Sequence, residues 1–234
     1  MKNVNVEMLG GSERTKLRAG IYIPNRENLL SLGSNKEIVS LTEISTSIII
    51  SYKESGYDRK RNLQKVLNYF SNYLSDNFEI ILVEQDSESK INWLNGVNNF
   101  KYIKHIFLKN NEIFNKGWGF NVGAKQAKGD YLIFNDSDVL VSHETYQMSL
   151  KLLEDFDVVN PYKYIYWLDE LKTINFINNN NEIALNLNEK LFAPSVITGG
   201  IFLIKKENFL EIKGFDENSF GYGYQDYIFD EKIK

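Results

Sequence analysis

Apolar residues follow two different periods along the chain from Thr46 onward. Short continuous apolar runs, which are typical of buried strands, occur at residues 47–52, 78–83, 102–108 and 131–134. Between these runs, apolar residues recur every three or four positions, as in Leu63, Val66, Leu67 and Phe70. That spacing predicts amphipathic helices, which we place at residues 58–74, 115–128 and 142–156. A further strand after Gly200 and a final helix near Asp226 complete the prediction.

Strands that alternate with helices are typical of βαβ units and of a mainly parallel sheet. We therefore predict a single α/β domain over residues 45–234, with a Rossmann-like central sheet flanked by helices. Residues 1–44 show no strong period and are assigned to an N-terminal extension of unknown role. Because such sheets bind ligands at the carboxyl ends of their strands, we expect the site among the polar clusters that follow the strands. These clusters are Tyr52-Lys53, Glu84-Gln85-Asp86 and Asp136-Ser137-Asp138.

The composition narrows the classes of function. The net charge of −4 argues against a non-specific nucleic-acid binder, which needs a basic face to displace counterions. The chain has no cysteine, which excludes a disulfide framework and a thiolate metal site. No apolar run approaches the ~20 residues that span a bilayer, and the N-terminus lacks a signal-peptide pattern. We expect a cytoplasmic protein without a transmembrane segment; peripheral membrane association and the oligomeric state stay open.

The pair Asp136 and Asp138 follows an apolar strand directly. Two carboxylates at this spacing can converge on one hard cation if the chain turns there, and Mg²⁺ or Mn²⁺ fills its remaining positions with phosphate oxygens and water. A nucleotide-sugar transferase needs such a cation to neutralise the diphosphate leaving group. In a plain strand, however, the two side chains would face opposite ways and could not share a cation. Taken alone, the pair is therefore better explained as ordinary turn residues after a strand.

Two other segments carry candidate chemistry. Arg59-Lys60-Arg61 begins the first helix, where backbone N–H groups favour a phosphate; a solvated basic face is the alternative. The segment 220–227 places glycines among aromatics, which indicates a loop over a ligand, with Asp226 as a candidate general base; packing of the aromatics into the core is the alternative. The glycines of 117–123 miss the dinucleotide fingerprint and are expected to let a helix approach the sheet.

Several motifs occur in a characteristic order along the chain. They are Asp58–Leu63 with Leu67–Phe70, Val83–Asp86, Ile113–Lys116 with Asn121–Gly123, Phe134–Asp138, Gly199-Gly200, Phe209, Gly214–Asp216 and Phe220–Asp226. From Ser47 to the C-terminus the sequence therefore resembles the β-1,4-galactosyltransferase family and its bacterial chondroitin-polymerase-like relatives, which have the GT-A fold. Each match is modest, whereas the ordered set is specific.

The resemblance implies an inverting glycosyltransferase that moves a hexose or N-acetylhexosamine from a UDP-sugar to a glycan hydroxyl, in the assembly of a polysaccharide or glycan. Mn²⁺, or Mg²⁺, is the implied cofactor, bound by Asp138 and Asp136. Asp226 is the implied base. The nucleotide-sugar contacts implied by position are Tyr52, Arg59, Gln85, Asn115, Lys116, Asp136, Gly199, Gly200, Tyr222 and Gln225.

The sequence departs from this family in four ways. Ser51-Tyr52-Lys53 replaces the family's P-F-R segment, which removes one arginine near the nucleotide. Gln225 stands where the family has glutamate, and Phe220 and Tyr222 replace tryptophans. The chain ends at Lys234, without a counterpart of the family's third metal ligand, a histidine, so we expect the C-terminal part of the family domain to be missing. These departures leave an alternative: a non-catalytic GT-A-like module, or a subunit of a larger polysaccharide synthase, that binds nucleotide or glycan. A glycoside hydrolase that uses Asp136 and Asp226 is a more distant alternative.

Overall fold

The protein is described by a computed structural model. It covers residues 19–21, 46–73, 77–94, 103–162, 165–178, 191–192, 199–219 and 224–233. Most of the predicted N-terminal extension lies outside these ranges, and so do Phe220 and Tyr222 of the predicted loop.

A seven-stranded sheet forms the centre of the molecule, in the order β1-β6-β9-β5-β2-β3-β4. Its strands are β1 (Ala19–Ile21), β2 (Thr46–Tyr52), β3 (Phe78–Asp86), β4 (Ile103–Lys109), β5 (Tyr131–Asn135), β6 (Val158–Asn160) and β9 (Ile201–Lys205). β9 runs antiparallel to β5 and β6, and the other neighbouring pairs are parallel. The predicted mainly parallel α/β sheet is therefore confirmed.

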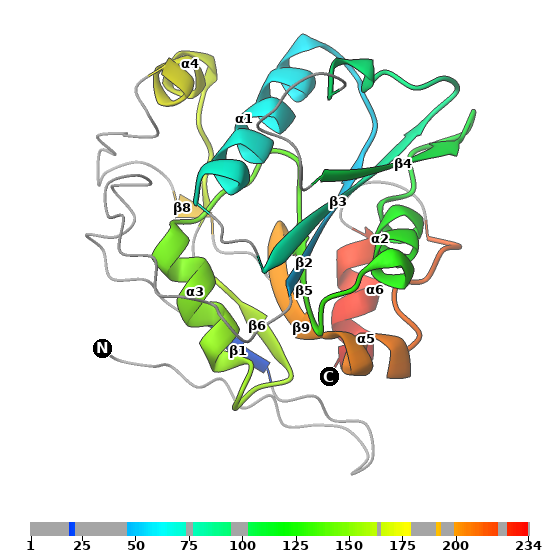
Figure 1. The fold of residues 1–234 in the computed structure, drawn as a ribbon, viewed down its shortest axis with the longest axis vertical. Coiled ribbons are helices and arrows are strands. Elements are labelled where there is room, and N and C mark those ends of the chain that lie inside the picture. The colour runs from blue at the N-terminus through cyan, green and yellow to red at the C-terminus, as the bar shows by residue number, and fades with distance from the viewer. Residues whose placement is uncertain are drawn as a thin grey trace.

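Helices cover both faces of this sheet (Figure 1). One face carries α1 (Tyr57–Tyr73) and α3 (His143–Leu152), and the other carries α2 (Lys116–Gln126), α5 (Lys206–Glu211) and α6 (Tyr224–Ile233). The smaller elements are α4 (Glu170–Asn178), a 3₁₀ turn (Asn92–Leu94) and a two-stranded sheet of β7 (Ile165–Tyr166) and β8 (Leu191–Phe192). None of the helices in the described ranges is long and apolar enough to cross a membrane.

Alternate residues of the central strands supply the two halves of the core. In β2, Ile48 and Ile50 pack with Leu63 of α1, whereas Ile49 lies on the opposite face with Phe120 of α2. All three isoleucines are completely buried. This burial on both sides explains why the strands read as continuous apolar runs instead of an alternating pattern.

The structure differs from the sequence prediction at the polar end of β3. The cluster Glu84-Gln85-Asp86 lies within the strand and pairs with β4. Glu84 is completely buried and accepts hydrogen bonds from Ser89 Oγ at 2.7 Å and the backbone N–H of Lys90 at 2.5 Å, with His105 Nε2 at 2.9 Å. Burial alone would raise the pKa of Glu84, but these hydrogen bonds outweigh it and the pKa is lowered. His105 of β4 thus has a structural contact with the neighbouring strand.

Several short elements were not anticipated from the sequence, among them β1, β6 and α5. β1 belongs to the segment expected to be an extension, and it pairs with β6 at the edge of the sheet. β6 and α5 are only 3 and 6 residues long, respectively, so neither spans two full periods of an apolar pattern. The predicted helix 142–156 ends earlier than expected, at Leu152.

Glycines let α2 lie directly against β2 and β3. A Cβ atom at Gly119 would overlap Ser51 Oγ of β2, and one at Gly123 would overlap Cγ2 of Ile49. The close approach predicted from residues 117–123 is confirmed, and it places the N-terminus of α2 over the carboxyl ends of the strands.

Replacing Gly123 with alanine should lower the free energy of unfolding. The substitution gains about 1 kcal/mol of helix propensity, but the overlap with the buried Ile49 forces α2 off the sheet. We expect a net loss of about 1–2 kcal/mol, read from the midpoint of urea unfolding. Lys125→Ala, at an exposed position of the same helix, is the control and should change stability by less than about 0.5 kcal/mol. A Gly123→Ala protein as stable as the parent would show that the contact is not close.

Candidate active site

The candidate site lies at the edge of the sheet where β2 and β5 end. Asp136 follows β5, and its backbone N–H donates to the carbonyl of Gly200 at 2.8 Å. Asn135 donates to the carbonyl oxygens of Asp136 and Val139, which holds the turn that follows the strand. The Asp136–Asp138 segment therefore turns at the strand end and does not continue as an extended chain.

Lys116 brings two predicted site residues together. Its Nζ lies 3.2 Å from Oδ1 of Asp136 and 2.8 Å from Oδ1 of Asp226. Asp136 is 20 positions and Asp226 is 110 positions away along the chain. The three side chains are largely shielded, with exposed fractions of 16%, 29% and 14% for Lys116, Asp136 and Asp226. The predicted metal-binding segment and the predicted base thus meet on one ammonium group.

The charge on Lys116 depends on these two carboxylates. Lys116 is the first residue of α2, where the helix dipole disfavours a cation. Burial also disfavours the charged form, but Asp136 and Asp226 outweigh it and raise the pKa of Lys116. For Asp226, burial is the larger influence and raises the pKa of the carboxyl, against the opposing effect of Lys116. The ammonium of Lys116 therefore depends on the two carboxylates for its charge, and it favours the ionised form of Asp226 in return.

Asp138 lies beside this cluster and is exposed. The protein around its carboxylate still displaces part of its water, and together with the neighbouring charge of Asp136 this raises the pKa of Asp138. Arg59 and Lys116 act in the opposite direction. Two carboxylates that repel each other form an oxygen donor pair suited to Mg²⁺ or Mn²⁺, which complete their shells with phosphate and water. Across the described ranges, no three acidic, histidine or cysteine side chains gather into a larger metal site.

A buried hydrogen-bond network fixes the start of α2. Asn115 caps the helix by accepting from the backbone N–H of Trp118 at 2.9 Å. Gln85 in β3 accepts from the N–H of Asn115 at 3.2 Å and donates to its carbonyl at 2.7 Å. The same amide donates to Ser51 Oγ of β2 at 3.3 Å. Lys116, which follows Asn115, is held to the sheet by this network.

Gln225 extends the network to α6. Its Oε1 accepts from the backbone N–H of Gly117 at 3.2 Å, and its Nε2 donates to Asn115 Oδ1 at 2.7 Å and to the carbonyl of Ser219. Gln225 is 4% exposed, and it immediately precedes Asp226. Gln85, Asn115 and Gln225, predicted as nucleotide-sugar contacts, are thus joined to one another inside the protein. Their direct contact with a ligand stays a prediction.

Arg59 and Tyr52 lie together near the end of β2. The guanidinium of Arg59 is 5.9 Å from the ring centre of Tyr52 and 5.9 Å from that of Phe114. Within the described residues, Tyr52 Oη, Arg59 Nε and Glu54 Oε2 are buried without a hydrogen-bond partner. Burial and the nearby Glu54 raise the pKa of Tyr52, so its hydroxyl stays a donor. Buried polar atoms without partners are uncommon in proteins, and they point to a group that completes the site.

Gly199 and Gly200 meet Tyr162, a residue that the sequence analysis missed. Gly200 has a φ of +81°, and a Cβ atom there would overlap the Tyr162 hydroxyl. This hydroxyl donates to the carbonyl of Gly199 and accepts from the N–H of Ile201 at 3.0 Å. Because Asp136 contacts the Gly200 carbonyl, Tyr162 helps to fix the Gly199-Gly200 turn beside the carboxylates. A single tyrosine after a three-residue strand carried no pattern that could have revealed this role.

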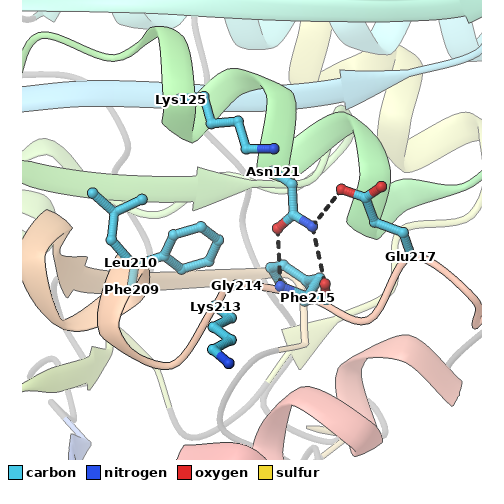
Figure 2. Close-up of a pocket in the computed structure, with 8 residues that line it drawn as sticks. All are labelled: Asn121, Lys125, Phe209, Leu210, Lys213, Gly214, Phe215 and Glu217. Atoms are coloured by element: carbon cyan, nitrogen blue, oxygen red, sulfur yellow. Dashed lines mark hydrogen bonds between the residues drawn. The ribbon is translucent and has the colours of Figure 1, made fainter.

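A cleft of about 360 Å³ lies elsewhere, between α2 and the loop that follows α5 (Figure 2). Figure 2 shows the side-chain amide of Asn121 hydrogen-bonded to the backbone of Phe215 and to the carboxylate of Glu217. These hydrogen bonds are 2.8–2.9 Å long. None of the predicted site residues lines this cleft, whose walls are Asn121, Lys125, Phe209, Leu210, Lys213, Gly214, Phe215 and Glu217. Asn121 therefore joins the motif at residues 121–123 to the motif at residues 214–216 through hydrogen bonds within the protein.

The family model described as "Glycosyltransferase like family 2" matches residues 47–233. The chain belongs to this family. The chain is 28% identical over 166 residues to an uncharacterized glycosyltransferase of Haemophilus influenzae. The alignment covers 68% of this chain and 53% of that relative, so the chain spans about half the length of the relative.

Solved structures support the GT-A fold of this family 2-like chain. S. aureus TarS 1–349, in complex with UDP-GlcNAc, has a TM-score of 0.56 at 16% identity, covering 81% of this chain and 53% of TarS 1–349. GalNAc-T7, with UDP, GalNAc and Mn²⁺, has a TM-score of 0.52 at 16% identity, covering 83% of this chain and 41% of GalNAc-T7. At this identity the likeness establishes the fold alone. The narrower resemblance to the β-1,4-galactosyltransferase group stays a prediction.

Replacing Gln225 with glutamate should disrupt the buried network. A carboxylate has no N–H to donate, so the oxygen that replaces Nε2 would lie against two acceptors, Asn115 Oδ1 and the Ser219 carbonyl. The other carboxylate oxygen would still accept from the N–H of Gly117. We expect a loss of about 1–3 kcal/mol in the free energy of unfolding at pH 7. The loss should shrink as the pH falls, because a protonated glutamic acid regains one O–H donor.

Tyr227→Glu is the matched control, since it adds the same charge to α6 at a position that is 53% exposed. It should change stability by less than about 0.5 kcal/mol. Equal stability of Gln225→Glu and the parent across pH 5–8 would contradict the assignment of the Gln225 amide.

Proposed function

We propose that this chain transfers a hexose or N-acetylhexosamine from a UDP-sugar to a hydroxyl of a glycan acceptor. The observation that carries the proposal is the meeting of Asp136 and Asp226 on Lys116, at the carboxyl edge of a mainly parallel sheet. Membership of the glycosyltransferase 2-like family supports it. The UDP-GlcNAc bound to TarS and the UDP, GalNAc and Mn²⁺ bound to GalNAc-T7 support the choice of donor class and cation.

The nucleotide is proposed to bind beside Tyr52 and Arg59. Tyr52 Oη and Arg59 Nε are buried donors without a partner among the described residues, and a uracil or ribose offers acceptors for both. The guanidinium adds a positive charge on the side where the diphosphate would lie. Gly199 and Gly200 are proposed to line the sugar, because the carbonyl of Gly200 accepts from the backbone N–H of Asp136, which places this turn beside the carboxylates. Tyr222, in the predicted loop of segment 220–227, is proposed to contact the donor as well.

Asp138 and Asp136 are proposed to hold the divalent cation. When bound, this cation would neutralise charge on the departing diphosphate. Lys116 lies close enough to Asp136 to contribute a second positive charge on the same side of the sugar. Gln85, Asn115 and Gln225 are proposed to act indirectly, by holding Lys116 and Asp226 in place through the buried network.

Asp226 is proposed as the general base. Its pKa is raised by burial, which makes its carboxylate a better proton acceptor than an exposed aspartate. In the proposed step, Asp226 takes the proton of the acceptor hydroxyl, and the oxygen of that hydroxyl bonds to the anomeric carbon as the bond to UDP breaks. Attack on the side opposite the leaving group inverts the anomeric centre.

Asp226→Asn should abolish transfer while UDP binding persists. The amide keeps the size and part of the polarity of the side chain but cannot accept the proton, so we expect turnover to fall about 10²–10⁴-fold. The measurement is release of UDP from a panel of UDP-sugars with a saccharide acceptor, and Glu231→Gln on the exposed face of α6 is the control. Full turnover by Asp226→Asn would refute the assignment of the base.

Thermal unfolding with UDP, with and without Mn²⁺, tests the donor site. At 100 times its dissociation constant, a ligand adds about 2.7 kcal/mol, or roughly 5–10 °C for a chain of this size. We expect a Mn²⁺-dependent rise in the parent that Asp138→Asn abolishes. No rise in the parent under any condition would contradict the donor site. A rise without turnover of any UDP-sugar would favour the alternative, a non-catalytic module or synthase subunit.

A further inference from the structure

The ammonium of Lys116 lies where a divalent cation at Asp136 would need to be accommodated. Nζ is 3.2 Å from Asp136 Oδ1, and it also touches both carboxylate oxygens of Asp226, at 2.8 and 3.0 Å. Two unit charges of equal sign at about 4 Å in a partly shielded site repel each other by several times the thermal energy. A cation that binds Asp136 must therefore displace Lys116 or bear that repulsion.

Lys116 has few other positions that would stabilise its charge. It lies at the unfavourable end of the α2 dipole, its side chain is 16% exposed, and its ammonium contacts the two carboxylates. The backbone N–H groups of Gly117 and Trp118, in the first turn of α2, are already bonded to Gln225 and Asn115. An anion that approaches the start of α2 would therefore meet the ammonium of Lys116 in place of these two N–H groups.

We infer that Lys116 competes with the divalent cation for Asp136 in the nucleotide-free protein, and that a diphosphate relieves this competition by drawing the ammonium away. The inference rests on the proposed function, since it concerns the same carboxylates. Lys116 then acts as a positioning residue that couples the cation to the nucleotide. The protein binds the cation weakly by itself and retains it when the diphosphate is present.

The test is the affinity of the nucleotide-free protein for Mn²⁺, followed by the electron paramagnetic resonance signal of free Mn²⁺. Lys116→Met keeps the length of the side chain and removes its charge. It should bind Mn²⁺ at least about tenfold more tightly than the parent. Lys116→Arg, which keeps the charge, should bind Mn²⁺ as weakly as the parent. The gain of Lys116→Met should disappear when Asp136→Asn is added.

Two controls separate competition from other effects. Lys125→Met removes a charge from the same helix at an exposed position and should change the affinity less than about twofold. Lys116→Gln is the second neutral variant, used with Lys116→Met after circular dichroism has shown which of them is folded. A folded neutral variant that binds Mn²⁺ no more tightly than the parent would overturn the inference. Failure of UDP with Mn²⁺ to stabilise the parent would instead count against the proposed function.

Discussion

The ion cluster of Lys116 with Asp136 and Asp226 is the interaction on which the candidate site depends. It joins the end of a central strand to the first turn of α2 and the first turn of α6. None of the three charges is favourable in isolation, because each side chain is largely shielded from water. The attraction of Lys116 to the two carboxylates therefore helps to hold the first turn of α6 beside the end of β5.

This cluster is supported by packing and by hydrogen bonds that lie below it. Gly119 and Gly123 allow α2 to contact β2, so that the helix starts directly above the strand ends. The amides of Gln85, Asn115 and Gln225 then connect β3, α2 and α6 in one buried network. Such a network fixes the direction of each helix end, since every misplaced polar group would be left without a partner. Rigid placement of this kind is what a site needs to orient a sugar donor and an acceptor hydroxyl.

Much of the fold followed from the sequence, because buried strands and amphipathic helices leave strong periodic patterns. The segment Asp136–Asp138 and the base candidate Asp226 were also predicted. The prediction came from the resemblance and from their positions, after a predicted strand and near the predicted final helix. The pairing of Lys116 was not, since its partners are 20 and 110 positions away. Gln85 and Gln225 illustrate a second limit: a polar residue near the end of an element has the same local pattern whether it faces a ligand or the interior. The role of Tyr162 depended on the position of Gly199, 37 residues away.

A crystal structure of the protein with UDP and Mn²⁺ tests most directly whether the Lys116 cluster marks the donor site. The anomalous signal of manganese should lie against Asp136 and Asp138, with the diphosphate between the metal and Lys116 and the nucleoside beside Tyr52 and Arg59. Asp226 should then face the space left for the acceptor. Manganese and UDP bound elsewhere, for instance in the cleft between Lys125 and Lys213 shown in Figure 2, would contradict the assignment of the site.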